Sequence, residues 1–559
     1  MSGVLSRAPI RVRGALAALR RSTARWRDDP SRPRPALAAT GRPAIAPTLC
    51  LAFCVSLVIV ASVAYFLLGH YQRLDGIYFL VDDAWIHLRI AQNLADGYGF
   101  SFNSGHPIAA STAPLWTVLL ALSYRLTGDL VFAAYFWGIV FFAITCLLIY
   151  RLVLRITDSF LLAAGSAMVA SCCPWLTWSA LSGMEILLSA AFVLATLFLH
   201  LKYQDSHTWK GFVGVVAAAL TTLTRPETYV LFLAIVIHRV ARSLLAPRET
   251  LRRTLCVWLP MAGLIFALIV LPYGVFSIAT AGSFFPNTYT AKVGDMGLMG
   301  ALKGGSVEGI KRAILTNPRL YLADFKKALE EISPLLVRVL PFGMLGLLWN
   351  ENCILPLFLV LFPLVVGMVI PTKRVSWPWY RHMLNLIPVF VTISLAGSHR
   401  LLKKVLSPAG KRATALRAAL LGILTIVMGS YFVSEQPKVR ESFVSRGAAM
   451  KGEHISVANW INQNLPPQAV IASSDIGVVG FYTQRFIIDT EGLITPEILG
   501  QQRLNSPAKD REVYQYLQEA KPDYLVKFYW VYPTFSQAEF APVHTSGNLS
   551  VYRTPWTRY

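Results

Sequence analysis

The sequence predicts a multi-pass α-helical membrane protein with a small α/β domain at its C-terminal end. Of the 559 residues, 55% are hydrophobic and 15% are charged, and the mean hydropathy is +0.50. These values are not typical of soluble proteins. Apolar runs long enough to cross about 30 Å of hydrocarbon as helices follow one another over residues 47–434. After about residue 435 the pattern changes to short segments punctuated by Pro and Gly.

The first 46 residues precede the first apolar run and are strongly basic. They contain ten arginines, and Asp28 and Asp29 are their only acidic residues. An Arg-rich, acid-poor start is also a feature of transit peptides, but no cleavage site of small residues is evident. We therefore expect residues 1–46 to form a disordered cytosolic tail that fixes the orientation of the first span.

Residues 47–434 contain eleven apolar segments that are candidate spans. They lie near 47–69, 129–150, 159–180, 185–202, 210–224, 229–246, 255–278, 334–350, 353–371, 383–398 and 416–434. With a cytosolic N-terminus, the basic connections after the second, sixth and tenth segments face the cytosol. The short apolar stretch 112–127 is expected to lie in the membrane interface. A long first loop, about 70–128, is then extracytoplasmic.

The C-terminal region, 435–559, is expected on the same outer side as a soluble α/β domain. "AVIAS" and "FIIDT" have the pattern of short strands, and "EVYQYLQEAKPDYLV" that of a helix leading into another strand. Pro and Gly punctuate these segments. An alternation of strands and helices of this kind predicts one small layered domain.

Charge and cysteine content exclude two classes of function. The net charge of +22 is distributed in short clusters between apolar runs, which favours loops that face anionic lipid over nucleic-acid binding. The seven cysteines lie in or beside apolar runs without CxxC or Cys/His metal spacing. We therefore predict no nucleic-acid partner and no zinc site.

Two adjacent aspartates, Asp82 and Asp83, open the motif "DDAWIHLR" in the first outer loop. Apolar residues recur at helical spacing as far as Leu94, which predicts an amphipathic helix on the membrane surface with both aspartates at its start. Capping of that helix is the structural alternative, and it accounts for one aspartate. The second, with Arg89 and Asn103, favours a polar pocket in which one carboxylate is a base. We favour Asp82 as this base and expect it to stay ionised.

Three ionisable residues lie at the ends of apolar segments. Glu185 follows "LSGM", and Arg225 and Glu227 flank a proline between two segments. Charges at such depths usually face protein or water, so each is a functional candidate. The alternative is that Arg225 pairs with one or both glutamates and only joins helices.

Two further outer segments carry cations beside aromatic residues. "GSFFPNTYTAKV" contains Asn287 and Lys292, and "WPWYRHM" contains Tyr380, Arg381 and His382. Arg and Lys at an outer interface suit a phosphate group. The alternative is an aromatic belt whose cations reach the interface. For Arg381 we favour phosphate binding, because outward-facing cations otherwise depart from the usual charge distribution.

These motifs, in this order, resemble the GT-C superfamily of membrane glycosyltransferases. The resemblance rests on "DDAWIHLR", "NLADGYGFSFNSGHP", "LSGME", "LTRPE", "PNTYTAK" and an Arg beside a Tyr before a late segment, and it covers about residues 70–500. It is strongest to the branch of mycobacterial terminal β-(1→2) arabinofuranosyltransferases. The acidic motif is its most specific element.

The resemblance implies an inverting glycosyltransferase in a bacterial-type inner (plasma) membrane. It implies transfer of a sugar, arabinofuranose in this branch, from a polyprenyl-phosphate donor to a glycan, lipid or protein acceptor outside the cytoplasm. Asp82 and Asp83 are then the base candidates, and Arg225, Lys292 and Arg381 the donor-phosphate candidates. No P-loop and no GxGxxG motif is present. No cofactor is predicted, and a role for a divalent cation is left open.

Two alternatives from other classes compete with this interpretation. A transporter or flippase of lipid-linked sugars predicts inverted repeats and polar residues at the membrane midplane, whereas the polar motifs here gather at one interface. A non-catalytic protein of envelope glycan assembly gives the paired aspartates no purpose. The lipid-linked glycosyltransferase is therefore the preferred hypothesis.

Overall fold

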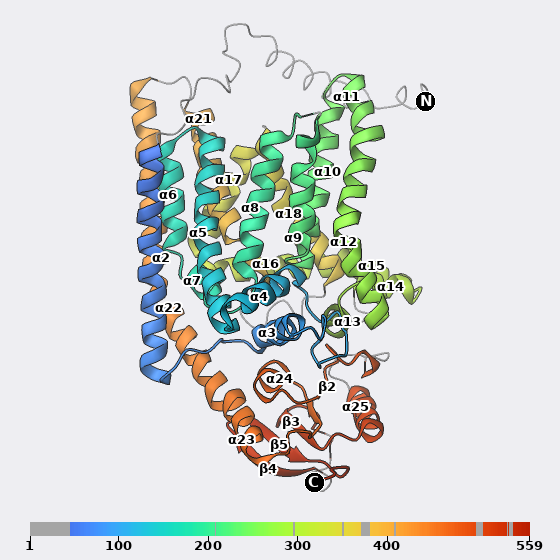
Figure 1. The fold of residues 1–559 in the computed structure, drawn as a ribbon. Coiled ribbons are helices and arrows are strands. Elements are labelled where there is room, and N and C mark those ends of the chain that lie inside the picture. Colours follow the sequence, from blue (N-terminus) through green and yellow to red (C-terminus); the bar gives the residue numbers. More distant parts are fainter. Residues whose placement is uncertain are drawn as a thin grey trace.

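A computed structural model of the chain describes residues 45–206, 208–293, 297–348, 351–370, 381–406, 410–498, 507–533, 535 and 540–559. It consists of a bundle of long apolar helices with a small α/β domain at one end (Figure 1). The predicted fold class is confirmed. The first described helix begins at Ile45, so the disordered tail predicted for residues 1–46 lies, except for its last two residues, outside the described part.

The helices of the bundle fall on all eleven predicted segments. They are α2 (Ile45–Leu74), α5 (Leu130–Thr157), α6 (Phe160–Ser171), α7 (Pro174–Ala180), α8 (Ile186–Tyr203), α9 (Val213–Thr222), α10 (Tyr229–Leu244), α12 (Leu259–Ala281), α17 (Pro334–Leu347), α18 (Ile354–Val369), α19 (Arg381–Leu384), α20 (Ile387–Thr392), α21 (Ser398–Val405) and α22 (Lys411–Ala449). Within the described ranges, 6 helices are long and apolar enough to cross a membrane, or up to 7 if the bent pair α6–α7 is one span.

The predicted count of eleven spans is therefore not confirmed. Several apolar segments form helices that are short or interrupted, such as α9 with 10 residues. The segment near 383–398 is divided between α19, which ends at Leu384, and a helix that runs from α20 through a π-helical turn over Ile393–Gly397 into the basic α21. Hydropathy identifies apolar stretches but does not detect such local breaks.

The first outer loop forms two helices, α3 (Asp82–Ala95) and α4 (Pro114–Thr127), at the end of the bundle that carries the α/β domain (Figure 1). The short apolar stretch 112–127 thus becomes a 14-residue helix packed on α3. It ends at Gly128, whose φ of 70° is left-handed. The next residue, Asp129, caps α5 by accepting from the amides of Val131 and Phe132.

The second long outer loop is also helical, and the basic segments lie at the opposite end of the bundle. The loop contains α13 (Asn287–Val293), α14 (Leu298–Lys303), α15 (Val307–Lys311) and α16 (Asn317–Ile332). The basic helix α11 (Arg248–Arg253) and the basic end of α21 lie at the end away from the α/β domain (Figure 1). Polar motifs and basic clusters are therefore separated along the bundle.

The α/β domain begins later than the predicted boundary at residue 435. Helix α22 is 39 residues long and continues past this position despite Pro437 within it. It is followed by α23 (Ser456–Asn464), α24 (Gly477–Thr483) and α25 (Pro507–Ala520), and by the strands β1 (Ile471–Ser473), β2 (Ile487–Asp489), β3 (Tyr524–Phe528), β4 (Ala541–Ser546) and β5 (Leu549–Arg553).

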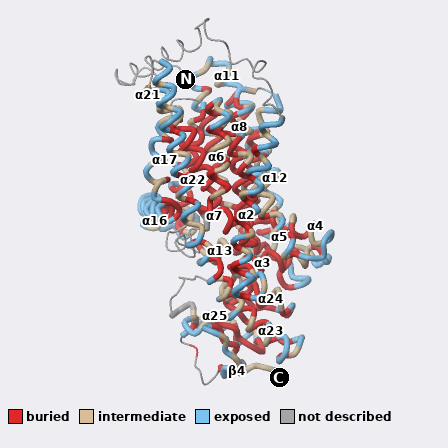
Figure 2. Tube along the Cα trace, turned by 90° about the vertical axis from the view of Figure 1, so that its left-hand side faces the viewer, coloured by how far each residue is buried: buried red, intermediate tan, exposed pale blue. Residues whose placement is uncertain are grey.

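The five strands form one mixed sheet in the order β2-β1-β3-β5-β4. Strand β1 is parallel to β2 and β3, whereas β5 is antiparallel to both β3 and β4. "AVIAS" and "FIIDT" provide β1 and β2 as predicted, while β4 and β5 were not predicted. Both faces of the sheet are covered by apolar clusters, one of which extends to α3, and buried residues continue from the bundle into the domain (Figure 2).

Candidate active site

Helix α3 lies between the bundle and the α/β domain and contacts both. Trp85 and Leu88 pack into the apolar core of the bundle, while Ile86 and Ile90 belong to the core of the α/β domain. These four residues occupy two faces of one helix, as the helical period requires. The start of α3, with both aspartates, is thereby fixed at the junction of the two parts.

Asp82 is bound by the backbone of the α/β domain. Its two carboxylate oxygens accept from the amides of Gly477 at 2.7 Å and Val478 at 2.8 Å, the first residues of α24. Asp82 does not cap its own helix, because the N-cap position of α3 is Val81 and makes no side-chain bond there. Burial, together with the nearby Asp475 carboxylate, raises the pKa of Asp82 to about 7. The expectation that this carboxylate stays ionised therefore does not hold at acidic pH.

Asp83 faces the other way, toward the second outer loop. Its Oδ2 lies 3.3 Å from Nζ of Lys292 on α13, and the side chains of Asp83 and Lys292 remain 27% and 39% exposed. The two residues are 209 positions apart in the chain. A carboxylate and an ammonium group accessible to a ligand thus meet at the end of the bundle that carries the α/β domain.

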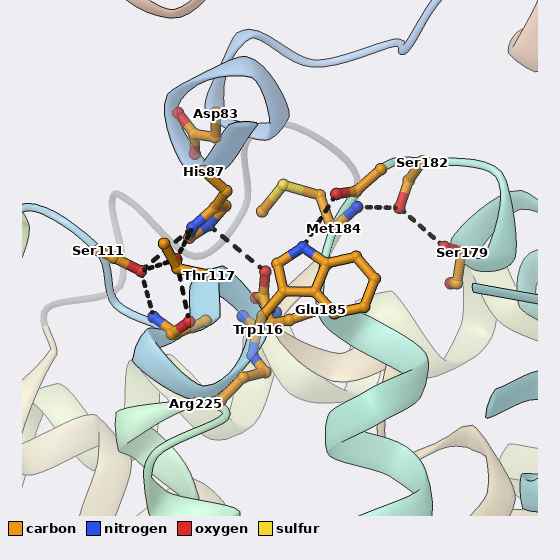
Figure 3. A network of polar contacts seen from close by, with 12 residues as sticks. Asp83, His87, Ser111, Trp116, Thr117, Ser179, Ser182, Met184, Glu185 and Arg225 are labelled. Atoms are coloured by element: carbon orange, nitrogen blue, oxygen red, sulfur yellow. Dashed lines mark hydrogen bonds and ion pairs between the residues drawn. The ribbon is translucent and has the colours of Figure 1, made fainter. Parts of the chain in front are cut away.

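A buried polar network lies directly below Asp83 (Figure 3). His87 is one turn along α3 from Asp83 and hence on the same face. Its Nδ1 lies 3.1 Å from Oγ of Ser111 and 3.4 Å from Oγ1 of Thr117, and its Nε2 lies 3.6 Å from Oε2 of Glu185. Burial lowers the pKa of His87, so the neutral imidazole is favoured.

Arg225 forms the base of this network and pairs with both glutamates. Its NH1 lies 2.8 Å from Oε1 of Glu185, and its Nε lies 2.6 Å from Oε1 of Glu227. All three side chains are buried. The contacts favour the alternative in which Arg225 joins the ends of helices, because its guanidinium is engaged by two carboxylates.

Three predicted site residues instead hold the outer loops and the α/β domain in place. Arg89 donates from Nε to the carbonyl of Phe102 at 3.1 Å. Asn103 both donates to the carbonyl of Ile487 on β2 and accepts from its amide. Asn287 donates from Nδ2 to the carbonyl of Gly492 at 2.7 Å. The hydrogen bonds of Arg89, Asn103 and Asn287 thus go to backbone groups of the loops and the α/β domain and not to the Asp83–Lys292 pair.

The late aromatic and basic motif is only partly described. Tyr380 lies outside the described residues. Arg381 and His382 begin α19, and their side chains are likewise outside the described part. The roles predicted for these three residues stay predictions.

Sequence reasoning missed several residues that contact the site. His87 carried a signal, because it follows Asp83 by four positions on a predicted helix. Ser111 and Thr117 gave none, since Ser and Thr are common in loops. Asp475 lies in the α/β domain, and nothing local indicates that it lies near Asp82.

In the described part of the chain, no group of three or more His, Cys, Asp or Glu side chains has metal-binding geometry.

Two family models match parts of the chain. Residues 106–276 match the family described as dolichyl-phosphate-mannose-protein mannosyltransferase. Residues 444–557 match a domain of unknown function, DUF8728. No curated protein matches the sequence significantly.

Solved structures of membrane glycosyltransferases share the fold. ArnT from Cupriavidus metallidurans, in the apo state, is similar with a TM-score of 0.52 at 13% identity, over 88% of this chain and 97% of that chain. The Archaeoglobus fulgidus oligosaccharyltransferase in complex with Zn and sulfate has a TM-score of 0.54 at 14% identity, over 90% of this chain and 73% of that chain. The arabinosyltransferase EmbB from Mycobacterium smegmatis has a TM-score of only 0.39, which supports no argument.

The fold is that of the GT-C membrane glycosyltransferases, and the chain is a multi-pass membrane protein. With the mannosyltransferase family match to residues 106–276, it indicates a glycosyltransferase of the GT-C type. The predicted superfamily and enzyme class are thus confirmed. The arabinofuranosyltransferase branch is not established.

Proposed function

We propose that the chain is an inverting glycosyltransferase that uses a polyprenyl-phosphate-linked sugar, with Asp83 as the base and Lys292 at the donor phosphate. The proposal rests on one observation, which is that the two adjacent aspartates have different contacts. Both oxygens of Asp82 bind backbone amides, whereas Asp83 is partly exposed beside Lys292. This assignment reverses the preference for Asp82 that the sequence alone suggested.

The transfer needs one proton acceptor and one cation, and the pair supplies both. Asp83 takes the proton of the acceptor hydroxyl as its oxygen attacks the anomeric carbon of the donor. The bond between this carbon and the phosphate oxygen breaks on the opposite face of the sugar, and the electron pair leaves with the polyprenyl phosphate. The ammonium group of Lys292 stabilises the charge that develops on the leaving phosphate.

His87 is proposed as a positioning residue rather than a second base. It is buried below Asp83, and its Nδ1 faces the hydroxyl groups of Ser111 and Thr117. The lowered pKa keeps the imidazole neutral, so it does not add a second cation beside the donor phosphate. Its Nε2 lies 3.6 Å from Oε2 of Glu185, which Arg225 holds in turn, so His87 packs α3 against the buried ion pairs.

Two observations support the lipid-linked donor and the outer location. Helices α3 and α13, which carry Asp83 and Lys292, lie at the end of the bundle opposite the basic helix α11 (Figure 1). This is the arrangement that a cytosolic N-terminus and an extracytoplasmic α/β domain require. Structures with the same fold include ArnT bound to undecaprenyl phosphate and archaeal oligosaccharyltransferase AglB in complex with an inhibitory peptide and a dolichol-phosphate. Arabinofuranose as the sugar is supported only by the order of the motifs.

Incubation of the purified protein with a panel of polyprenyl-phosphate sugars tests the proposal. We expect cleavage of one donor, with release of polyprenyl phosphate. Lys292→Ala should weaken donor binding by about tenfold to over a hundredfold, as expected for loss of about 1.5–3 kcal/mol from a charge-assisted bond. Lys303→Ala is the matched control, because Lys303 is exposed on α14 in the same outer loop and should leave donor binding unchanged.

The same experiment separates the two other classes of function. A transporter or flippase would move the lipid-linked sugar across a vesicle membrane without breaking its bond to phosphate. A non-catalytic assembly protein would neither move the lipid-linked sugar across the membrane nor cleave it. Uncleaved donor throughout the panel, with stable protein, would contradict the proposed transfer.

A further inference from the structure

The carboxyl edge of the sheet in the α/β domain faces the start of α3, where Asp82 and Asp83 lie. Because β1 is parallel to both β2 and β3, their carboxyl ends share one edge. The segment after β1 leads to Gly477, whose amide binds Asp82, and the segment after β2 contains Gly492, which contacts Asn287. The edge is thus oriented toward the proposed site.

The sheet changes direction at this same edge. From β1 the chain passes through α24 to β2 on one side, and then through α25 to β3 on the other side of β1. In open α/β sheets, ligands bind outside the carboxyl ends of strands at such a switch point. The segments that follow β1 and β3 are therefore where a ligand is expected.

Two large aromatic side chains are exposed immediately after β3. Tyr529 is 67% and Trp530 is 52% exposed. The Trp530 ring stacks on Phe528, with centroids 4.6 Å apart and an interplanar angle of 10°, while Tyr529 meets Trp530 edge-on at 4.8 Å. Clusters of exposed aromatic side chains are found at ligand-binding and interaction sites more often than elsewhere on protein surfaces.

The aromatic cluster is continuous with the start of α3. Phe528 contacts His454, with ring centroids 5.6 Å apart. His454 Nε2 lies 2.9 Å from Oδ2 of Asp475. Asp475 in turn directly precedes the turn whose amides bind Asp82. A chain of contacts thus connects the exposed Trp530 to the residue beside the proposed base.

Buried polar atoms at this edge lack partners. Oγ of Ser474, Oγ1 of Thr490 and Nδ1 of His454 have no hydrogen-bond partner among the described residues. The three residues are 7%, 0% and 6% exposed. Ser474 follows β1 and Thr490 follows β2, so two such atoms lie at the carboxyl ends of neighbouring strands. Unsatisfied buried groups of this kind are costly and point to a bound water or ligand.

We infer that the carboxyl edge of this sheet, with Tyr529 and Trp530 exposed on it, binds the acceptor and that the acceptor is a glycan chain. This inference rests on the proposed transfer reaction. A sugar ring has an apolar face of C–H groups that stacks on aromatic rings and a rim of hydroxyl groups that hydrogen-bonds with carboxylates such as that of Asp475, whose side chain is 37% exposed. The contacts lead from this surface to Asp82, the residue that precedes the proposed base in the chain.

Binding of short glycans to the purified full-length protein tests this inference. The probes are hexasaccharides of arabinofuranose, galactofuranose, mannose and glucose, measured by calorimetry. We expect at least one to bind, and Trp530→Ala to weaken its binding by about tenfold or more. Trp530→Phe should retain most of the affinity, because it keeps a stacking ring. Tyr559→Ala is the control, since Tyr559 is 37% exposed and follows β5, whose last residue pairs with the first residue of β3 at the opposite edge.

The outcomes separate this inference from the proposed reaction. No binding of any hexasaccharide, or equal binding by folded Trp530→Ala, would overturn the acceptor surface. Donor cleavage without added glycan is measured on the same preparations, and the control Tyr559→Ala should cleave the donor at the wild-type rate. Hexasaccharide binding without donor cleavage in the wild-type protein would refute the transfer reaction and leave the glycan surface standing.

Discussion

Replacement of Asp83 by Asn tests the assignment of the base most directly. The change keeps the size of the side chain but removes its basicity and its ion pair with Lys292, whose Nζ lies 3.3 Å away. Loss of a general base lowers turnover by about 10²–10⁴-fold, equivalent to about 3–5 kcal/mol in the barrier. Because the donor phosphate is held by other groups, we expect the Michaelis constant for the donor to change little.

Asp82→Asn is the matched control, since it makes the same chemical change one residue earlier. The oxygens of Asp82 accept from the amides of Gly477 and Val478 and so face the α/β domain, whereas the proposed base, Asp83, faces Lys292. We expect turnover to fall less than about tenfold. The assay is sugar transfer with separate kcat and KM values, on variants shown by thermal unfolding to be folded. Wild-type turnover in Asp83→Asn, or an equal loss in both variants, would refute this division of roles.

Three further predictions concern orientation, stability and pH. A reporter fused after Tyr559 should lie outside the cytoplasm and one near Arg248 inside it; a cytosolic signal from the terminal reporter would invalidate the proposed orientation. Arg225→Ala should lower the free energy of unfolding by about 3–5 kcal/mol, because it leaves Glu185 and a second buried carboxylate without their cation; an unchanged melting curve would show that the ion pairs do not matter. Burial and the nearby Asp475 carboxylate raise the pKa of Asp82 to about 7 in the folded state. The contact between α3 and the α/β domain should therefore be strongest below about pH 4 and weaken by up to about 1.4 kcal/mol per pH unit as the pH rises to about 7. Hydrogen exchange of α3, corrected for intrinsic rates, should show this change in the wild-type protein and not in Asp82→Asn.

Much of the fold was predictable because composition and hydropathy act over long stretches. The apolar segments, the separation of the polar motifs from the basic clusters and the first two strands all follow from local pattern. The number of spans did not, since local breaks such as the one between α19 and α20 leave hydropathy unchanged. Strand β4 was missed because most of its side chains are exposed, so it lacks the alternation that marks a strand.

The site was predictable in its residue types but not in its contacts. Asp83 and Lys292 stood out as charges in outer loops, and the structure brings them together. The role of Asp82 depends on Gly477, which is 395 residues away, and no local pattern carries that information. Whether Arg225 paired with Glu185 depended on the distance between the ends of two helices, so both interpretations stayed open until the fold was known.

The contact of α3 with the α/β domain has a consequence for biosynthesis. Asp82 leaves the ribosome early, but the amides that bind it belong to Gly477 and Val478, which are translated only after α22 has been made. Ile86 and Ile90 likewise have no apolar cover from this domain until its strands have been made and have folded. On the proposed assignment, the membrane helices are therefore made first and the active centre is completed last, and we expect a chain that stops before β1 to be inserted but inactive.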